Sequence, residues 1–373
     1  MEYDVIIVGA GSMGAAAGYY LSKEGKKVLL IDAYNPPHTF GSHHGDTRLI
    51  RHAYGEGESY VPLALAAQKL WLSLEKEAGE EIFLNTGVLS IGDEESDFIK
   101  TVIKSAQNYK LPVEVLSATE IQKRYKGLNM PNDFIGCLET SSGILFCQKA
   151  IQAYLKLSLE NGATLLTNSK VTAIETIGDR VQVVTNGKTY TANSLVVSAG
   201  GFSRSLLELL DLDLLIQPHR ALFAWFDVKD DDYKASEFPG FSVELPEGIY
   251  YGFPNVNGEG LKVGRHEGTP INEGEYIPFG KQEGDGDEIQ KFVKTYFKNA
   301  GELKYGKNCQ YTMTPDEDFI IDTHPNASNI IIATGFSGHG FKFSSVVGKI
   351  ISDLAIKGKT EHDISKFTIE RFF

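Results

Sequence analysis

The amino-acid sequence predicts an α/β protein in which a doubly wound domain is interleaved with a β-rich (α+β) domain. A short apolar strand near the start of the chain runs into a glycine-rich turn and a helix. Two later apolar runs, 194–198 and 330–333, also end on glycine, as buried parallel strands do. Residues 216–315, between these runs, are rich in strand and aromatic patterns. A chain of 373 residues favours two domains.

The first unit reads as strand, turn, helix and strand. Its expected elements are strand 3–8, helix 15–23 and strand 27–31. Gly9, Gly11 and Gly14 form a G-x-G-x-x-G turn between the first strand and the helix. Such a turn lets a pyrophosphate approach the backbone at a helix N-terminus. Asp32 follows the second strand, where it is expected to accept hydrogen bonds from a ribose. The unit therefore predicts a bound dinucleotide.

The glycine turn alone does not choose between NAD and FAD. The strand ending at Gly200 and the strand before Gly335 favour FAD, because an extended FAD needs close backbone approach at several strand ends. Taken singly, each of these ends also fits an ordinary strand followed by a turn. Together they indicate a Rossmann-type FAD-binding domain.

The remaining elements follow from local pattern. We expect a polar loop over 36–55, a helix at 63–78, a strand pair within 82–92, helices at 97–108 and 148–160, a strand at 164–167, a meander over 171–191 with a hairpin turn at Asn186-Gly187, and a helix at 343–354. The predicted FAD-binding domain comprises 1–60, 148–215 and 316–373. The predicted substrate domain comprises 61–147 and 216–315.

Composition excludes several partners. A net charge of −13 argues against non-specific nucleic-acid binding and against docking on an anionic membrane. Three cysteines form no disulfide framework, and no spacing predicts a metal site. The start of the chain shows no secretory signal, and no apolar run reaches membrane-spanning length. These features predict a cytoplasmic protein.

The predicted loop concentrates basic residues: 41–54 holds three His and two Arg. Arg48 and Arg51 are three apart, so one helical turn would place both on one face. Arg51 is suited to hold a substrate carboxylate in bidentate fashion, and Arg48 to lie against a flavin ring. The alternative is a solvated basic loop.

Four segments resemble the monomeric sarcosine oxidase and N-methyl-L-tryptophan oxidase family. They are Gly41–Glu56, Ile249–Pro254, Asp316–Asp322 and Gly335–Phe343. The resemblance spans essentially the whole chain. It implies a monomeric flavin oxidase that demethylates an N-methyl amino acid with O2, giving the free amino acid, formaldehyde and H2O2.

The resemblance also implies site residues. Cys309 matches the cysteine that binds one FAD per chain covalently, and Lys262 the lysine that promotes O2 reduction. Arg51 and Lys342 match the pair that binds the substrate carboxylate. The other matched positions are Gly338 and Lys342 at the flavin, His44 and Arg48 near its ring, and Tyr251, Tyr311 and His266 in the substrate cavity.

Substrate size is addressed by one position. Ser242 stands where sarcosine oxidases of the family carry methionine, so the cavity is expected to be enlarged and N-methyl-L-tryptophan is favoured. Residues 335–337 and 363–365 look closer to the sarcosine type, and sarcosine is the alternative. Remoter alternatives are a dehydrogenase that passes electrons to a carrier, and a non-catalytic FAD-binding sensor.

Overall fold

β1 (Glu2–Val8) lies at the centre of the first of two large sheets. The structure is a computed structural model that describes residues 2–228 and 231–373. Alternate side chains of β1 enter different cores: Val5 and Ile7 pack under helices, whereas Ile6 and Val8 pack on the opposite face. β1 is therefore buried on both sides, as its β-branched sequence predicts.

The first sheet is mixed. Its strands are β1, β2 (Val28–Ile31), β9 (Thr164–Leu166), β10 (Val171–Ile177), β11 (Arg180–Thr185), β12 (Lys188–Val197), β18 (Ile320–His324) and β19 (Ala327–Thr334). The order is β10-β11-β12-β1-β2-β9, and β19 also pairs with β12. Because β1, β2, β12 and β19 run parallel, their carboxyl ends meet at one edge.

Four helices share one core against this sheet: α1 (Ser12–Lys23), α2 (Val61–Ala78), α5 (Cys147–Glu160) and α8 (Ser344–Lys357). The crossing of α1 and α8 is close, because a Cβ on Gly348 would lie 2.5 Å from the Cβ of Ala16. The short α6 (Ser203–Glu208) and the leucines that follow it cover the other face.

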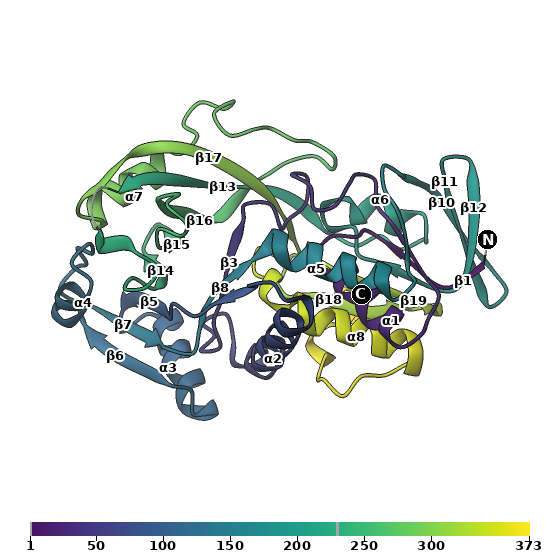
Figure 1. Cartoon of the computed structure of the whole chain (residues 1–373), viewed down its shortest axis with the longest axis horizontal. Coiled ribbons are helices and arrows are strands. Elements are labelled where there is room, and N and C mark those ends of the chain that lie inside the picture. Colours follow the sequence, from purple (N-terminus) through teal and green to yellow (C-terminus); the bar gives the residue numbers. More distant parts are fainter. Residues whose placement is uncertain (1, 229–230) are drawn as a thin grey trace.

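The second sheet has the order β17-β13-β16-β15-β14-β5-β7-β6 and forms the left half of Figure 1. Its strands are β5 (Val88–Asp93), β6 (Val113–Ser117), β7 (Phe134–Glu139), β13 (Gln217–Val228), β14 (Gly240–Leu245), β15 (Gly248–Phe253), β16 (Leu261–Pro270) and β17 (Ala300–Met313). The helices α3 (Asp97–Tyr109), α4 (Ala118–Arg124) and α7 (Asp287–Tyr296) accompany it. Phe292 of α7 stacks on Tyr250 of β15, with ring centroids 4.1 Å apart.

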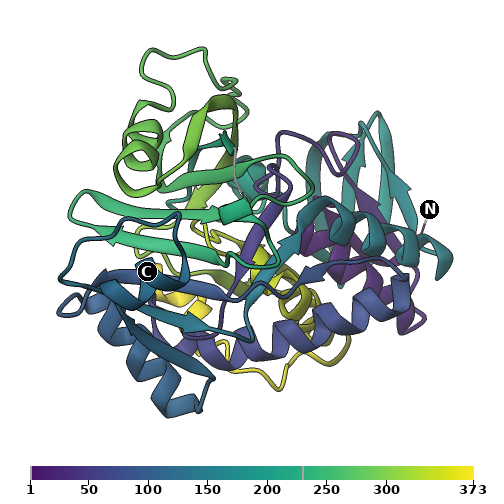
Figure 2. The same cartoon turned by 60° about the vertical axis from the view of Figure 1, so that its left-hand side comes forward.

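A small third sheet joins β3 (Thr47–Ile50), β8 (Gly143–Phe146) and β4 (Phe83–Leu84). β3 lies between the two large sheets in both views (Figure 1, Figure 2). The remaining short elements are the 3-10 helices η1 (Glu58–Tyr60), η2 (Gly200–Phe202), η3 (Asp231–Tyr233), η4 (Phe341–Phe343), η5 (Ser365–Phe367) and η6 (Ile369–Phe372).

The structure confirms the predicted fold class and corrects several elements. The loop over 36–55 contains β3, and the strand pair within 82–92 is two strands of different sheets. The first helix begins at Ser12 rather than residue 15. The strands predicted over 188–191 and 194–198 are the single strand β12. Residues 216–315 include the helix α7 as well as strands.

The division of the chain into two domains stays a prediction, and the packing of α2 leads us to change one of its boundaries. Residues 61–78 form α2, which packs on α5 and α8 beneath the first sheet rather than on the second. We therefore propose that α2 belongs to the FAD-binding domain. Within the described residues, none of the helices has the length and apolar character needed to cross a membrane.

Candidate active site

The first cavity lies at the edge where the carboxyl ends of β1, β2 and β12 meet. Gly9 has φ +94°, a conformation that favours glycine. A Cβ on Gly14 would lie 1.8 Å from the carbonyl oxygen of Gly9, so the turn closes on the helix only without a side chain there. Gly11 and Ser12 line the cavity at the N-terminus of α1. The predicted anion-binding geometry is thus present.

Asp32 joins the glycine turn to the loop after β2. Its Oδ2 accepts from the Ala10 N–H at 2.8 Å, and its Oδ1 accepts from the Tyr34 N–H at 2.9 Å. His38 Nε2 lies 3.2 Å from Oδ1. Asp32 also lines the cavity, where a carboxylate oxygen has further lone pairs for a ribose hydroxyl.

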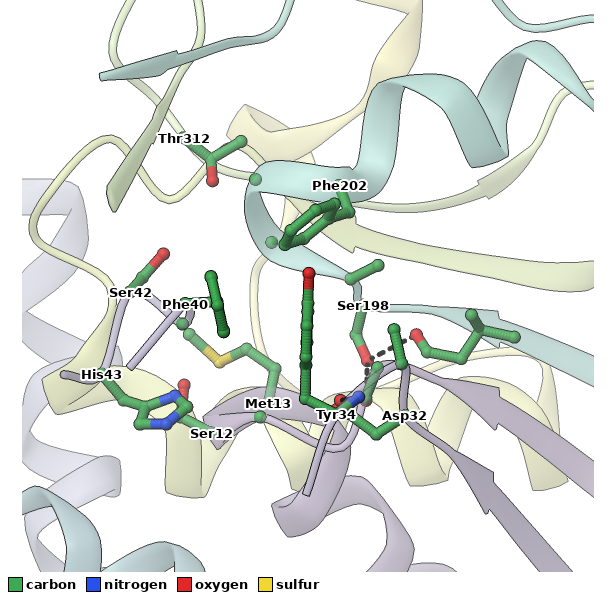
Figure 3. A pocket seen from close by; sticks show the side chains of 18 of the residues that line it. Ser12, Met13, Asp32, Tyr34, Phe40, Ser42, His43, Ser198, Phe202 and Thr312 are labelled. Carbon is green, nitrogen blue, oxygen red and sulfur yellow. Dashed lines mark hydrogen bonds between the residues drawn. The ribbon is translucent and has the colours of Figure 1, made fainter. Parts of the chain in front are cut away.

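Aromatic side chains form much of the wall of the first cavity. Tyr34 and Phe40 stack with ring centroids 4.3 Å apart, and Phe202 lies 5.9 Å from Tyr34. Figure 3 shows these side chains around a shared space, with His43 at its side. Gly200, which begins η2, lines the same space with φ +56°. Sequence reasoning identified Gly200 but missed the aromatic residues and His43, because no motif marks them.

The second cavity, of about 70 Å³, adjoins the first. Both cavities share the lining residues Arg48, Tyr311, Gly338 and Phe341. The second cavity is further lined by Leu49, Arg51, Glu56, Ser242, Ile249, Tyr251, Phe253, His266, His339 and Lys342. It therefore brings together eight of the predicted residues from distant parts of the chain: Arg48, Arg51, Ser242, Tyr251, His266, Tyr311, Gly338 and Lys342.

Arg51 and Glu56 form a largely buried ion pair in this cavity, with Nη2 and Oε1 2.6 Å apart. Burial acts to raise the pKa of Glu56, but the charges of Arg51 and Lys342 outweigh it and lower that pKa to about 2. Arg51 Nη1 and Glu56 Oε2 are buried without a hydrogen-bond partner among the described residues. Each has an unused position for a ligand.

Lys342 supplies a second cation. Its Nζ donates to Tyr54 Oη at 3.0 Å and to the His339 carbonyl oxygen at 2.9 Å. Burial lowers the pKa of Lys342 to about 7, although the nearby Glu56 acts in the opposite direction. A negative ligand between Lys342 and Arg51 would favour the charged form.

Apart from Arg48, where the two cavities meet, the rest of the second cavity is neutral. Burial lowers the pKa of His266 to about 4, so its imidazole is neutral near pH 7. Its ring lies 5.6 Å from that of Tyr311 and 6.4 Å from that of Tyr251. Ser242 Oγ donates to Ser90 Oγ at 3.2 Å, on neighbouring strands. One end of the cavity thus holds Arg51, Lys342 and the Glu56 carboxylate, Arg48 lies where the two cavities meet, and the wall between them is aromatic or weakly polar.

Four predicted residues are absent from the lining of both cavities: Gly14, in the glycine turn, and Lys262, Cys309 and His44. His44 Nδ1 lies 2.8 Å from the carbonyl oxygen of Asn308. Cys309 is 1% exposed. Its neighbour on the same strand face, Tyr311, lines both cavities.

Lys262 is buried against the backbone that precedes Arg48, the residue that lines both cavities. Its Nζ donates to Thr47 Oγ1 at 3.0 Å and to the Thr47 carbonyl oxygen at 3.1 Å, and also to the carbonyl oxygen of Gly45. It lies 4.4 Å from the ring centroid of Phe253 and 4.8 Å from that of Phe223. Burial, assisted by the charge of Arg48, lowers the pKa of Lys262 to about 7.

Arg48 lines both cavities from a strand. Its Nη2 donates to the carbonyl oxygens of Ser42 and His44 at 2.8 Å each. The prediction that Arg48 and Arg51 share a helical turn is wrong, because 47–50 pair with β8 as β3. Strand pairing outweighs the local spacing, yet both guanidinium groups reach the second cavity.

The comparison with known families decides the class of the protein. The family described as FAD dependent oxidoreductase (DAO) matches residues 4–354. The chain belongs to the DAO family of FAD-dependent oxidoreductases.

DAO-family relatives match over the full length. The chain is 50% identical to monomeric sarcosine oxidase from Arthrobacter sp. (strain TE1826), covering 99% of this chain and 96% of the relative. It is 43% identical to N-methyl-L-tryptophan oxidase from Yersinia pestis (strain Pestoides F), covering 100% of both. Solved structures share the DAO fold. NikD, an amino acid oxidase, gives a TM-score of 0.87 at 23% identity and 98% and 97% coverage. L-proline dehydrogenase from P. horikoshii gives 0.88 at 20% identity and 100% and 98% coverage.

The residues present fit the FAD of a DAO-family protein. The first cavity leads from Asp32 past the N-terminus of α1 to Arg48, where the second cavity begins. Thr312 Oγ1 belongs to a residue lining this path and is buried without a hydrogen-bond partner among the described residues. Gly338 has φ +79°, and a Cβ there would lie 2.6 Å from the ring of Tyr311. An extended dinucleotide can therefore run along the cavity with its ring end beside the second cavity.

Proposed function

We propose that this DAO-family protein is an oxidase of small N-methyl amino acids that uses O2 as its electron acceptor. The observation that carries the proposal is the placement of Arg51 and Lys342 at one end of a cavity that opens onto the FAD path. Two cations recognise a carboxylate, while the neutral wall of Tyr251, His266 and Tyr311 accommodates an uncharged amine. The products would be the free amino acid, formaldehyde and H2O2.

The second cavity would orient the substrate by its carboxylate. Arg51 has an unpartnered N–H, and Lys342 has one donor beyond its two protein hydrogen bonds. Neutral His266 and the hydroxyls of Tyr251 and Tyr311 would leave the amine nitrogen unprotonated and reactive. The methyl C–N bond would then face Arg48 and Gly338, where the cavities meet.

Bound FAD would supply the two-electron chemistry. Loss of two electrons and two protons from the N-methyl amine gives an imine, which water hydrolyses to formaldehyde and the free amine. O2 takes up two electrons and two protons to give H2O2. We propose that Lys262 stabilises the negative charge that develops on O2, that Cys309 binds the flavin covalently, and that His44 supports the 308–309 backbone beside it. The monomeric state and the cytoplasmic location remain predictions from the sequence.

The identity of the N-methyl amino acid depends on room in the second cavity. Ser242 lines its wall, which favours the larger N-methyl-L-tryptophan expected from the sequence. Identity is nevertheless higher to the sarcosine oxidases, at 50% against 43% for the N-methyl-L-tryptophan oxidases. We therefore propose sarcosine as the first substrate to test, with N-methyl-L-tryptophan as the second candidate.

H2O2 release from sarcosine and from N-methyl-L-tryptophan, at matched concentrations, tests the proposal. We expect the higher kcat/KM for sarcosine, and we expect Ser242→Met to preserve that activity within about threefold because added bulk leaves a small substrate room. A preference for N-methyl-L-tryptophan that Ser242→Met abolishes would instead assign the larger substrate. H2O2 from neither compound would contradict the proposed function.

A further inference from the structure

Tyr54 lies against both cations of the second cavity, although no motif marks it. Its side chain is fully buried. The guanidinium carbon of Arg51 lies 5.0 Å from the centroid of its ring, and Lys342 Nζ lies 4.9 Å from it. Cations at these distances are attracted to an aromatic ring, most strongly where water is excluded. One ring therefore supports the two groups proposed to bind the substrate carboxylate.

The hydroxyl of Tyr54 belongs to a hydrogen-bond chain with a defined direction. His339 Nε2 lies 3.2 Å from the carbonyl oxygen of Glu317, so Nε2 carries the proton and Nδ1 is an acceptor. The Tyr54 hydroxyl lies 2.9 Å from this Nδ1 and donates to it. Its oxygen then accepts from Lys342 Nζ at 3.0 Å. Burial lowers the pKa of His339 to about 3, which keeps its ring neutral and preserves this direction.

These hydrogen bonds leave the ammonium group of Lys342 with a single unused N–H donor. An ammonium group has three N–H donors. One is used by Tyr54 and one by the carbonyl oxygen of His339. The two contacts fix the orientation of the group, so the third N–H is available to a ligand in the cavity that Lys342 lines.

The backbone around Tyr54 is fixed as well. The buried carboxylate of Glu139 accepts from the N–H groups of His52 and Ala53 at 2.9 Å each. Ser105 Oγ donates to the carbonyl oxygen of Tyr54 at 3.2 Å. The segment from Arg51 to Tyr54 is thus tied to β7 and α3, and its side chains can hold their positions before a ligand binds.

We propose that Tyr54 is a positioning residue for carboxylate recognition, with its ring supporting Arg51 and Lys342 and its hydroxyl, oriented by His339, fixing the ammonium group of Lys342. The inference rests on the proposed function, because it takes the carboxylate of an N-methyl amino acid as the ligand. It adds a residue that contacts neither the substrate nor the flavin.

Tyr54→Phe tests this role because it keeps the ring and removes the hydroxyl. We expect the KM for sarcosine to rise about 10-fold with kcat within about threefold, because a hydrogen bond to a charged group is lost. The Kd of propionate for the FAD-loaded protein, measured by calorimetry, should rise by a similar factor. The KM of sarcosinamide, which carries the same amine without a carboxylate, should change less than about twofold.

Tyr60→Phe is the matched control. Tyr60 is equally buried, and its ring lies 5.2 Å from that of Tyr54, but its hydroxyl donates to Asp318 at 2.6 Å. The Tyr60→Phe variant should bind propionate with the same Kd as the wild type. Equal losses in both variants, or equal effects on sarcosine and sarcosinamide, would overturn the inference.

A second variant and a binding measurement distinguish a failure of the inference from a failure of the proposed function. If Tyr54→Phe does not fold, His339→Leu removes the acceptor that orients the hydroxyl and should weaken propionate binding in the same way. Unchanged propionate affinity in the folded variant would overturn the inference. A wild type that binds propionate but oxidises neither N-methyl amino acid would contradict the proposed function while leaving the inference supported by the binding data.

Discussion

Replacing Lys262 with methionine is expected to slow the reaction of the reduced enzyme with O2 by about 100- to 1000-fold, the usual effect of removing one preorganised stabilising group. The Lys262 ammonium is buried, and its position is fixed by Gly45 and Thr47 and by the rings of Phe223 and Phe253. A fixed charge in a dry site stabilises charge developing on O2 without reorganisation. Stopped-flow mixing of the reduced enzyme with oxygenated buffer measures the effect, and anaerobic reduction by substrate should change only slightly.

Lys307→Met provides a matched control for this assignment. Lys307 Nζ lies 5.0 Å from the ring centroid of Trp225, close to the 5.2 Å of Lys262. Lys307 is paired with Asp46 at 2.8 Å and is partly exposed, so it has no role in our proposal. Its variant should react with O2 at the wild-type rate. An unchanged O2 rate in Lys262→Met, or an equal loss in both variants, would remove Lys262 from the O2 reaction.

The role proposed for Lys262 also predicts how the rate constant for O2 changes with pH. Burial lowers the pKa of Lys262 to about 7, so the group is charged below that pH and neutral above it. The rate constant for O2 in the wild type should therefore fall as pH rises through about 7. Lys262→Met has no such proton to lose, and its small residual rate should be flat over the same range.

Much of the first sheet and of the helices that cover it could be predicted, because the sequence patterns of these elements are local. The glycine turn, the apolar strands and the helices flanking them each show their period within a short window. β3 was missed because its partner β8 lies far along the chain, and a four-residue strand has no pattern of its own. α7 did carry a signal: Ile289, Phe292 and Val293 have helical spacing in a region interpreted as strands.

The candidate site was predicted mainly through its resemblance to a family rather than from chemistry visible in the sequence. Arg51 and Lys342 are distant in the chain, and only the fold places both in one cavity. Tyr54, Glu56 and His339 were not identified, although all lie within segments quoted for the resemblance. Their roles depend on contacts across the fold, such as the hydrogen bond between Tyr54 and His339, which no local spacing encodes.

Replacing Cys309 with alanine is expected to convert the flavin from fully retained to fully released when the protein is precipitated with acid. Cys309 is on β17, paired with Ala221 of β13, and its side chain shares a strand face with Tyr311, which lines both cavities. The thiol is thus next to the place where the ring end of FAD would lie. Absorbance of the supernatant and of the dissolved pellet measures the released and retained fractions.

Electrostatics alone does not single out Cys309, which makes Cys147→Ala the decisive control. Burial raises the pKa of both thiols, while Arg48 and Lys262 act to lower the pKa of each. Neither thiol lines a cavity, but Cys309 shares a strand face with Tyr311, which lines both cavities, whereas Cys147 begins α5 beside β8. If position relative to the flavin decides attachment, Cys147→Ala must keep its flavin through acid treatment. If the flavin stays bound to Cys309→Ala but is released from Cys147→Ala, the attachment must be assigned to Cys147. If acid releases the flavin from the wild type, this chain holds its FAD by the cavity contacts alone.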